Sequence, residues 1–218
     1  MADLHVKNTG STTSPFDTWA KAAGNLGTVT GAAAGDRYLL SSAHAGSTTG
    51  YTITFPGTPA NPNLLLCGTE AGASGISAMA ATAVETITGT TFTLNGSFYA
   101  EGIIWNFTST SSGAPTYAGS NGSVQRFKNC SFRYTGAAGS PQFLFGANSG
   151  GAASSMILEN CGIRGPSANF NVGVEHEVII RDGAWESGGT APTNCFSVGV
   201  SNKPVVFTVD GFDFTNIG

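Results

Sequence analysis

A six-residue pattern of apolar and polar positions recurs along the second half of the chain. It reads apolar, any residue, Asn/Asp/Glu, Cys/Gly, any residue, apolar. The fourth positions of the copies, residues 102, 130, 161, 183 and 211, lie 22 to 31 residues apart, and periods of about 20–50 residues are typical of stacked repeats. The clearest copies are Phe127–Phe132, Leu158–Ile163 and Ile180–Trp185, and looser copies are Tyr99–Ile104 and Val209–Phe214.

The third position of the pattern is expected to form the corner between two short strands. Asn and Asp tolerate left-handed backbone angles better than other residues with side chains. The apolar first and last positions would point inward and stack on their counterparts, because no repeat can bury its own apolar face. The pattern therefore predicts an all-β solenoid. Its expected corner residues are Glu101, Asn129, Asn160, Asp182 and Asp210.

The N-terminal part contains the one convincing helix pattern. A short strand is predicted at residues 3–8, and Ser14, Pro15 and Asp17 then give the N-cap, first-turn proline and early acid of a helix start. We predict an α-helix at about residues 15–26 whose apolar stripe covers another part of the fold. The stripe is formed by Phe16, Trp19 and Leu26, with Ala20 and Ala23 on the same face.

Short strands and long loops fill the rest of the chain. Stretches rich in Ser, Gly, Ala and Thr are expected to be long loops that project from the stack, at residues 68–89, 108–121 and 136–151. No shift in composition marks a second domain. Residues 1–218 are therefore predicted to form one domain, with an N-terminal cap at 1–36 and repeated coils at 37–218. Strands are predicted at residues 37–42, 51–55, 64–67, 91–94, 98–105, 155–163, 178–185, 195–200 and 205–214.

The first half of the chain resembles a known family in the order of its motifs. A short strand, the Trp19-bearing helix pattern, the turn Ala34-Gly35-Asp36 and a strand precede Phe55-Pro56-Gly57-Thr58-Pro59-Ala60-Asn61-Pro62 and an apolar strand. This order resembles the N-terminal segment of right-handed parallel β-helix proteins of the pectate-lyase-like kind, in particular those encoded by tailed bacteriophages. The resemblance covers residues 1 to about 110 as ordered motifs. It implies a right-handed parallel β-helix, an N-terminal helix over the first coil, and a homotrimer.

Composition narrows the possible partners. Only 10% of the residues are charged and the net charge is −4, so the chain lacks the basic surface of a nucleic-acid-binding protein. No window approaches the roughly 18 consecutive apolar residues of a membrane span. The N-terminus has no basic-then-apolar signal segment. Hydroxyl, amide and backbone groups must therefore cover the surface, as suits a β-rich component of a particle or an extracellular protein.

The cysteines and histidines give little support for a metal or redox centre. No C-x-x-C pair occurs, and Cys130 and Cys161 occupy the same repeat position, so they are expected to stack on neighbouring coils. A disulfide between them is geometrically possible, but reduced, buried thiols are favoured. Glu175-His176-Glu177 places its acids and its imidazole on opposite faces of a strand, so it is expected to be a solvated strand edge. No metal or other cofactor is expected.

Some acidic residues are candidate catalytic groups of a polysaccharide-cleaving enzyme. Glu101, Asp182 and Asp210 are the candidates, but turn formation explains their positions. Glu159, Arg181 and Glu186 flank the corners and are expected to pair across coils. No lyase or hydrolase motif appears where the resemblance would place one, so the resemblance implies a fold and not a catalytic site.

The leading functional hypothesis is a non-enzymatic structural protein of a tailed-phage virion. A homotrimer would decorate or cement the capsid surface, with the major capsid protein or another virion protein as its partner. Low charge, a C-terminal coil without an evident cap and a capped coil that starts almost at residue 1 favour this role. One alternative is a tailspike or tail-fibre module that binds host surface glycan through the loop aromatics Tyr117, Phe143 and Phe170. A polysaccharide-degrading enzyme is the third hypothesis.

Overall fold

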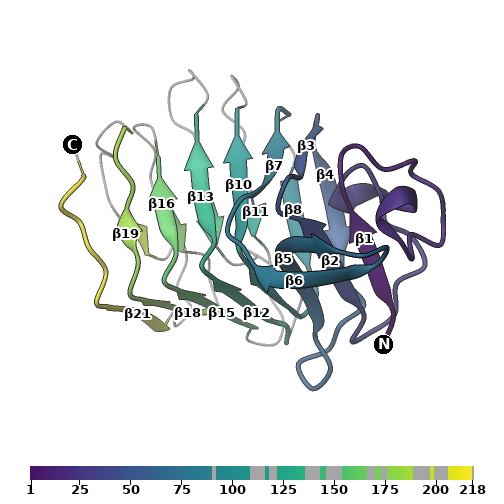
Figure 1. Cartoon of the computed structure of the whole chain (residues 1–218). Helices are drawn as coiled ribbons and strands as arrows, with labels where there is room; N and C mark the ends of the chain where they lie inside the picture. The colour runs from purple at the N-terminus through teal and green to yellow at the C-terminus, as the bar shows by residue number, and fades with distance from the viewer. Residues whose placement is uncertain are drawn as a thin grey trace.

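The protein is built from β-strands, with only two short 3-10 helices among the described residues (Figure 1). The computed structural model describes residues 1–89, 92–108, 116–117, 122–135, 143–145, 154–165, 170–172, 176–188, 197–198 and 206–217. Within this part of the chain, neighbouring strands are parallel except for β5 and β6, which pair antiparallel. The all-β prediction is confirmed.

The strands form three sheets. The first sheet has the order β1 (Asp3–Val6), β2 (Arg37–Ser41), β5 (Asn63–Ala71), β9 (Phe98–Glu101), β12 (Val124–Lys128), β15 (Ser154–Glu159), β18 (His176–Arg181) and β21 (Val206–Asp210), with β6 (Gly75–Met79) beside β5. The second has the order β19 (Ala184–Trp185), β16 (Gly162–Arg164), β13 (Ser131–Tyr134), β10 (Ile103–Phe107), β7 (Ala83–Ile87) and β3 (Ala45–Thr48). The third has the order β20 (Ser197–Val198), β17 (Phe170–Val172), β14 (Phe143–Phe145), β11 (Thr116–Tyr117), β8 (Phe92–Asn95) and β4 (Tyr51–Thr54).

The chain visits the three sheets in a fixed rotation. From β7 to β21, each strand of the second sheet is followed by one of the third and then one of the first. We call one such visit to all three sheets a circuit. Each circuit lies beside the previous one, so the chain progresses from one end of the molecule to the other (Figure 1).

The core consists of inward side chains that lie in register from circuit to circuit. In the first sheet, Ala100 pairs with Phe127, Phe127 with Leu158, and Leu158 with Ile180. In the second sheet the corresponding row is Trp105, Phe132, Ile163 and Trp185. All of these side chains are buried, and full burial of each large apolar one contributes about 1.5–3 kcal/mol. The stacking of Phe127, Leu158 and Ile180, and that of Phe132, Ile163 and Trp185, agree with the repeat pattern.

The corners between the first and second sheets require left-handed backbone angles. Asn129, Asn160 and Asp182 have φ of 51°, 51° and 54°. In the two looser copies the corner assignment was wrong by one residue, because Glu101 pairs with Lys128 and Asp210 pairs with Arg181, each one position before the corner. Both acids end their strands, and the left-handed residues that follow them are Gly102 and Gly211, with φ of 78° and 67°.

The predicted α-helix at residues 15–26 is not formed. Phe16 has a φ of 59°, which a right-handed helix excludes. The segment's backbone groups bond to distant partners instead, as when the Ala23 amide donates to the His5 carbonyl and the Ser11 amide to the Ala20 carbonyl. Only the 3-10 helices η1 (Trp19–Lys21) and η2 (Leu26–Thr28) remain. Phe16, Trp19 and Leu26 are nevertheless buried at this end of the molecule.

The stretch at residues 68–89 is also more ordered than its composition suggested. The end of β5, the whole of β6 and the whole of β7 lie within it, and β7 alternates buried and half-buried residues. The two strands of the β5–β6 hairpin pack so closely that small residues are needed here. A Cβ at Gly68 would lie 2.8 Å from the Ala78 carbonyl oxygen. The other two expected loops, at 108–121 and 136–151, lie mostly outside the described residues, apart from β11 and β14.

The close approach at the Gly102 corner gives a first testable prediction. A Cβ at Gly102 would lie 1.9 Å from the Ala80 carbonyl oxygen, whereas one at Gly72, with φ of 60°, would meet nothing within 4 Å. Gly72→Ala should therefore cost only the left-handed strain, about 1 kcal/mol. Gly102→Ala should lower the free energy of unfolding by a further 2 kcal/mol or so, because backbone must move. Urea unfolding of both variants measures the difference, and equal losses would contradict the close packing of this corner.

Candidate functional site

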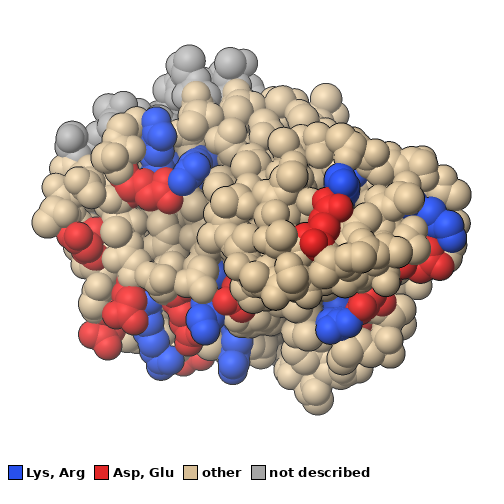
Figure 2. All heavy atoms as spheres, in the orientation of Figure 1, with Lys and Arg blue, Asp and Glu red and all other residues tan. Residues whose placement is uncertain are grey.

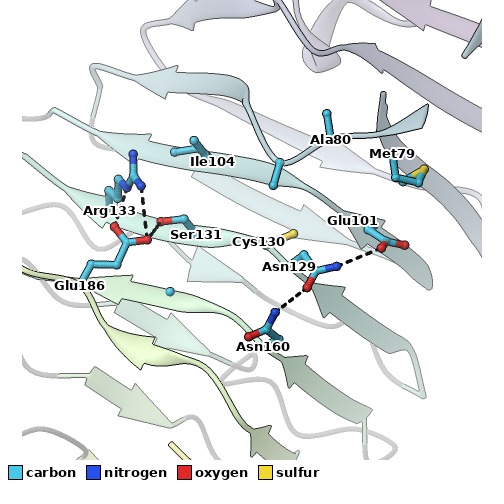
Figure 3. Close-up of a pocket in the computed structure, with 12 residues that line it drawn as sticks. Met79, Ala80, Glu101, Ile104, Asn129, Cys130, Ser131, Arg133, Asn160 and Glu186 are labelled. Carbon is cyan, nitrogen blue, oxygen red and sulfur yellow. Dashed lines mark hydrogen bonds and ion pairs between the residues drawn. The ribbon is translucent and has the colours of Figure 1, made fainter. Parts of the chain in front are cut away.

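A groove of about 460 Å³ lies where the β5–β6 hairpin ends against the second sheet (Figure 3). Its apolar wall is Met79–Ala81, the segment in which the chain leaves β6. Ile104, Ser131 and Gly162 of three successive strands of the second sheet contribute to its lining. Its polar groups are Glu101, Asn129 and Asn160 at the corner, with Arg133 and Glu186 farther along the second sheet.

A ladder of hydrogen bonds joins the corner residues of three circuits. Tyr99 Oη donates to Glu101 Oε2 (2.5 Å), and Asn129 Nδ2 donates to Glu101 Oε1 (3.1 Å). Asn160 Nδ2 then donates to Asn129 Oδ1 (2.7 Å). Burial, together with the hydrogen bond to Glu101, raises the pKa of Tyr99 above its ordinary value. Both oxygens of Glu101 therefore accept hydrogen bonds from the protein itself.

Glu186, the residue after β19, makes a second polar cluster that reaches across β16 to β13. It accepts hydrogen bonds from Ser131 Oγ (2.5 Å) and Arg133 Nε (2.7 Å), both on β13. The carboxylate reaches them across β16 at Gly162, where a Cβ would lie 2.1 Å from Glu186 Oε1. Glycine at this position therefore leaves the space through which Glu186 joins circuits that are not adjacent.

Only some of the sequence-predicted residues meet at the groove. Glu101, Asn129 and Asn160 share its edge, whereas Asp182 and Asp210 lie farther along the stack and do not line it. Phe16, Trp19 and Leu26 do not line the groove either, and are buried at the N-terminal end. The side chains of Tyr117, Phe143 and Phe170 are outside what the structure describes, although these residues belong to β11, β14 and β17.

Sequence reasoning missed the Glu186 cluster and the hairpin wall. Glu186 was expected to flank a corner and to pair across coils, and it does pair with Arg133, but the sequence did not identify its partners Ser131 and Arg133, which are 55 and 53 positions away. Stacking the hexapeptide copies in register places Ser131, Gly162 and Ala184 in one row, and this alignment could have indicated the cluster. No signal in the Ala- and Ser-rich sequence of the hairpin indicated that it forms a wall.

A buried acid–histidine pair was also missed. His44 Nε2 and Glu85 Oε1 are 3.1 Å apart, and both side chains are fully buried. Glu85 Oε1 also accepts a hydrogen bond from the Leu26 amide (2.9 Å). This pair therefore attaches η2 to β7 and does not open into the groove.

The described cysteines are buried, as is typical of structural rather than reactive thiols. Cys130 and Cys161 are buried and neither forms a disulfide, in agreement with the favoured prediction, whereas Cys195 lies outside the described residues. Burial raises the pKa of Cys161 to about 12 and that of Cys130 well above its ordinary value. Because the thiolate is the reactive form, neither cysteine is suited to act as a nucleophile.

The described part of the chain offers neither a metal-binding cluster nor a membrane-spanning helix. No group of three or more His, Cys, Asp or Glu side chains is arranged to hold a metal ion there. Nor does that part of the chain contain a helix long and apolar enough to cross a membrane.

Comparison of the chain with protein-family models, with curated proteins and with solved structures found no match.

The buried thiols give a second testable prediction. Cys67, Cys130 and Cys161 should resist alkylation by iodoacetamide at pH 8.5 in the folded protein and react fully in urea, since each is buried. Ionisation of Cys130 and Cys161 is disfavoured only in the folded state, so their contribution to stability should fall as pH rises above about 8.5, the pKa of an unfolded thiol. Peptide mass spectrometry identifies which cysteines react. Rapid modification of Cys130 or Cys161 in the folded chain would contradict their placement.

Proposed function

We propose that the chain is a right-handed parallel β-helix and a non-enzymatic structural protein of a tailed-phage virion, in the role of capsid decoration or cement. The observation that carries the non-enzymatic role is that both carboxylates in the groove are committed to the scaffold. Glu101 bonds to Tyr99 and Asn129, and Glu186 bonds to Ser131 and Arg133. A carboxylate that fixes neighbouring circuits is poorly placed to exchange protons with a substrate.

The rotation of strands through three parallel sheets supports the β-helix. Each circuit returns to the first sheet one strand farther along, from β9 to β12, β15, β18 and β21. Crossover connections between parallel strands of one sheet are right-handed in about 98% of cases. The sequence resemblance to phage-encoded β-helices agrees with this handedness.

The sparse charge supports a role in assembly. Lys, Arg, Asp and Glu occupy little of the face in Figure 2, and charges of both signs lie close together at its lower left, where Figure 1 draws β12, β15, β18 and β21. Because desolvation of isolated charges opposes association, a surface of hydroxyl, amide and apolar groups is covered by other subunits more readily, provided that its polar groups find hydrogen-bond partners across the interface. We therefore expect a homotrimer bound to the major capsid protein or another virion protein.

Two measurements test this proposal. Light scattering on the purified chain should give three times the chain mass of 22.1 kDa. Antibody labelling or cryo-electron microscopy of the encoding phage should place the protein on the head. Density only at the tail tip would overturn the decoration role. Cleavage of host polysaccharide that is lost in Asp182→Ala or Glu186→Ala would overturn the non-enzymatic role.

The groove favours a second candidate, a receptor-binding module of a tailspike or tail fibre that recognises host surface glycan. Its two kinds of wall suit a saccharide, which has apolar C–H faces and polar hydroxyl groups. Met79–Ala81 would contact the apolar C–H faces, and the amides of Asn129 and Asn160 would bond to the hydroxyl groups. The cavity volume is within the roughly 300–1,000 Å³ of small-molecule sites.

The glycan candidate predicts a specific loss of binding. Asn160→Gly keeps a residue that tolerates the left-handed corner but removes the amide, and should weaken binding to a bacterial polysaccharide array about tenfold. Asp182→Gly is the matched control, because Asp182 occupies the same kind of corner outside the groove. Equal binding by both variants and the parent chain would exclude the groove as the receptor site.

A further inference from the structure

The tip of the β5–β6 hairpin is fastened to the N-terminal segment by two side chains. Three consecutive carbonyl oxygens of the tip, those of Ala73, Ser74 and Gly75, lie within hydrogen-bonding distance of Trp19 or His5. The Trp19 amide donates to Ala73 (2.9 Å) and Trp19 Nε1 donates to Gly75 (3.0 Å). His5 Nε2 lies 2.8 Å from the Ser74 oxygen. Figure 1 shows the hairpin extending from the stack toward β1.

The second nitrogen of His5 also faces a carbonyl oxygen. His5 Nδ1 lies 2.8 Å from the oxygen of Phe16, and the histidine is fully buried. A carbonyl oxygen only accepts hydrogen bonds, and a neutral imidazole has a single N–H to donate. The doubly protonated ring therefore satisfies both contacts, whereas the neutral ring turns a lone pair toward one of the two oxygens with no water to intervene.

The charged groups nearby partly balance one another. Glu70 of β5 lies 2.9 Å from Lys7 of β1 and accepts a hydrogen bond from Ser41. Burial acts to raise the pKa of Glu70, but the hydrogen bonds to Ser41 and Lys7 and the charges of Lys7 and His5 lower it. Glu70 thus favours a positive ring, and Lys7 opposes it. Asp17 and Lys21 of the N-terminal segment pair with each other at 3.0 Å, both exposed.

We propose that His5 is a proton-dependent clamp that fastens the β5–β6 hairpin to the N-terminal segment. The closed clamp holds a proton that the open one releases. Histidine exchanges its proton between about pH 5 and 8. Since closing takes up a proton, the clamp is strongest at acidic pH and weakens as pH rises through this range. Opening of the clamp exposes the hairpin tip and the indole of Trp19, which packs edge-on against the His5 ring with centroids 4.6 Å apart in the closed clamp.

The clamp acts on the tip and leaves the groove in place. At the other end of the hairpin the Ala80 amide donates to the Cys67 carbonyl oxygen (3.0 Å), a bond between backbone groups that do not titrate. Opening at residues 73–75 therefore need not displace the wall at Met79–Ala81. The proposal is independent of whether the groove binds glycan.

Hydrogen exchange followed by NMR tests the clamp in the intact chain. Protection of the Trp19 amide and indole N–H, corrected for the intrinsic exchange rate, should fall by up to about tenfold per pH unit between pH 6 and 8. His5→Gln retains hydrogen-bonding capacity without a titratable ring and should remove this dependence. Trp19→Phe should reduce protection of the Trp19-position amide at every pH and keep the slope. The Ala80 amide is the internal control and should show no slope.

Ring-nitrogen NMR of the unaltered protein provides a readout that needs no variant. At pH 5 both nitrogens of His5 should carry protons, and the signal should change to that of a neutral ring as protection of the Trp19 amide falls. A ring that is neutral at pH 5 while the tip is fully protected would overturn the proposal. So would a His5→Gln variant that keeps the parent slope, because His44 or another group would then be responsible.

Discussion

The register of one circuit on the next is the constraint on which the rest of the molecule depends. Each inward side chain is buried by the corresponding residue of the neighbouring circuits, as Phe127 is by Ala100 and Leu158. A shift of one residue would turn the apolar row of an entire strand outward. Register therefore stabilises the core and, at the same time, determines which polar groups meet outside it.

The corners keep this register from circuit to circuit. A residue with left-handed backbone angles follows each of β9, β12, β15, β18 and β21, and at Asn129 and Asn160 its amide also bonds along the stack. Gly102 achieves the same turn without a side chain, which lets the Ala80 carbonyl approach where a Cβ would lie 1.9 Å from its oxygen. The preceding Glu101 is then free to face the groove and to receive the Asn129 amide. The left-handed corner is thus formed by Asn in some circuits and by Gly102 in another. Because Gly102 has no side chain and follows Glu101, its corner forms the edge of the groove.

The sequence predicted the parts of the fold that repeat and missed those that occur once. Periodicity was enough for the β-rich class, the inward rows and the corners at Asn129, Asn160 and Asp182, because each copy supports the others. The helix predicted at 15–26 does not form. Its sequence pattern occurs only once, so no second copy could contradict the local helix propensity, and the backbone of this segment bonds instead to His5 and to residues 11–13. The corners at Glu101 and Asp210 were assigned one position early, because an acid followed by glycine resembles the Asn–Cys pair. The Glu186 cluster could not be read from local sequence, since its partners are brought together only by two successive steps of stacking.

The few ionisable side chains in the described interior serve mainly to join elements that the stacking alone would leave apart. Glu85 joins η2 to β7 through Leu26, Glu186 bridges β13 and the chain after β19, and His5 joins β1 to the hairpin tip. Each of these contacts would leave a buried or half-buried polar group unsatisfied if its partner were removed, at a cost of about 1–3 kcal/mol. A sparsely charged chain therefore concentrates its electrostatic contacts at the additions to the repeat, namely the cap, the hairpin and the groove.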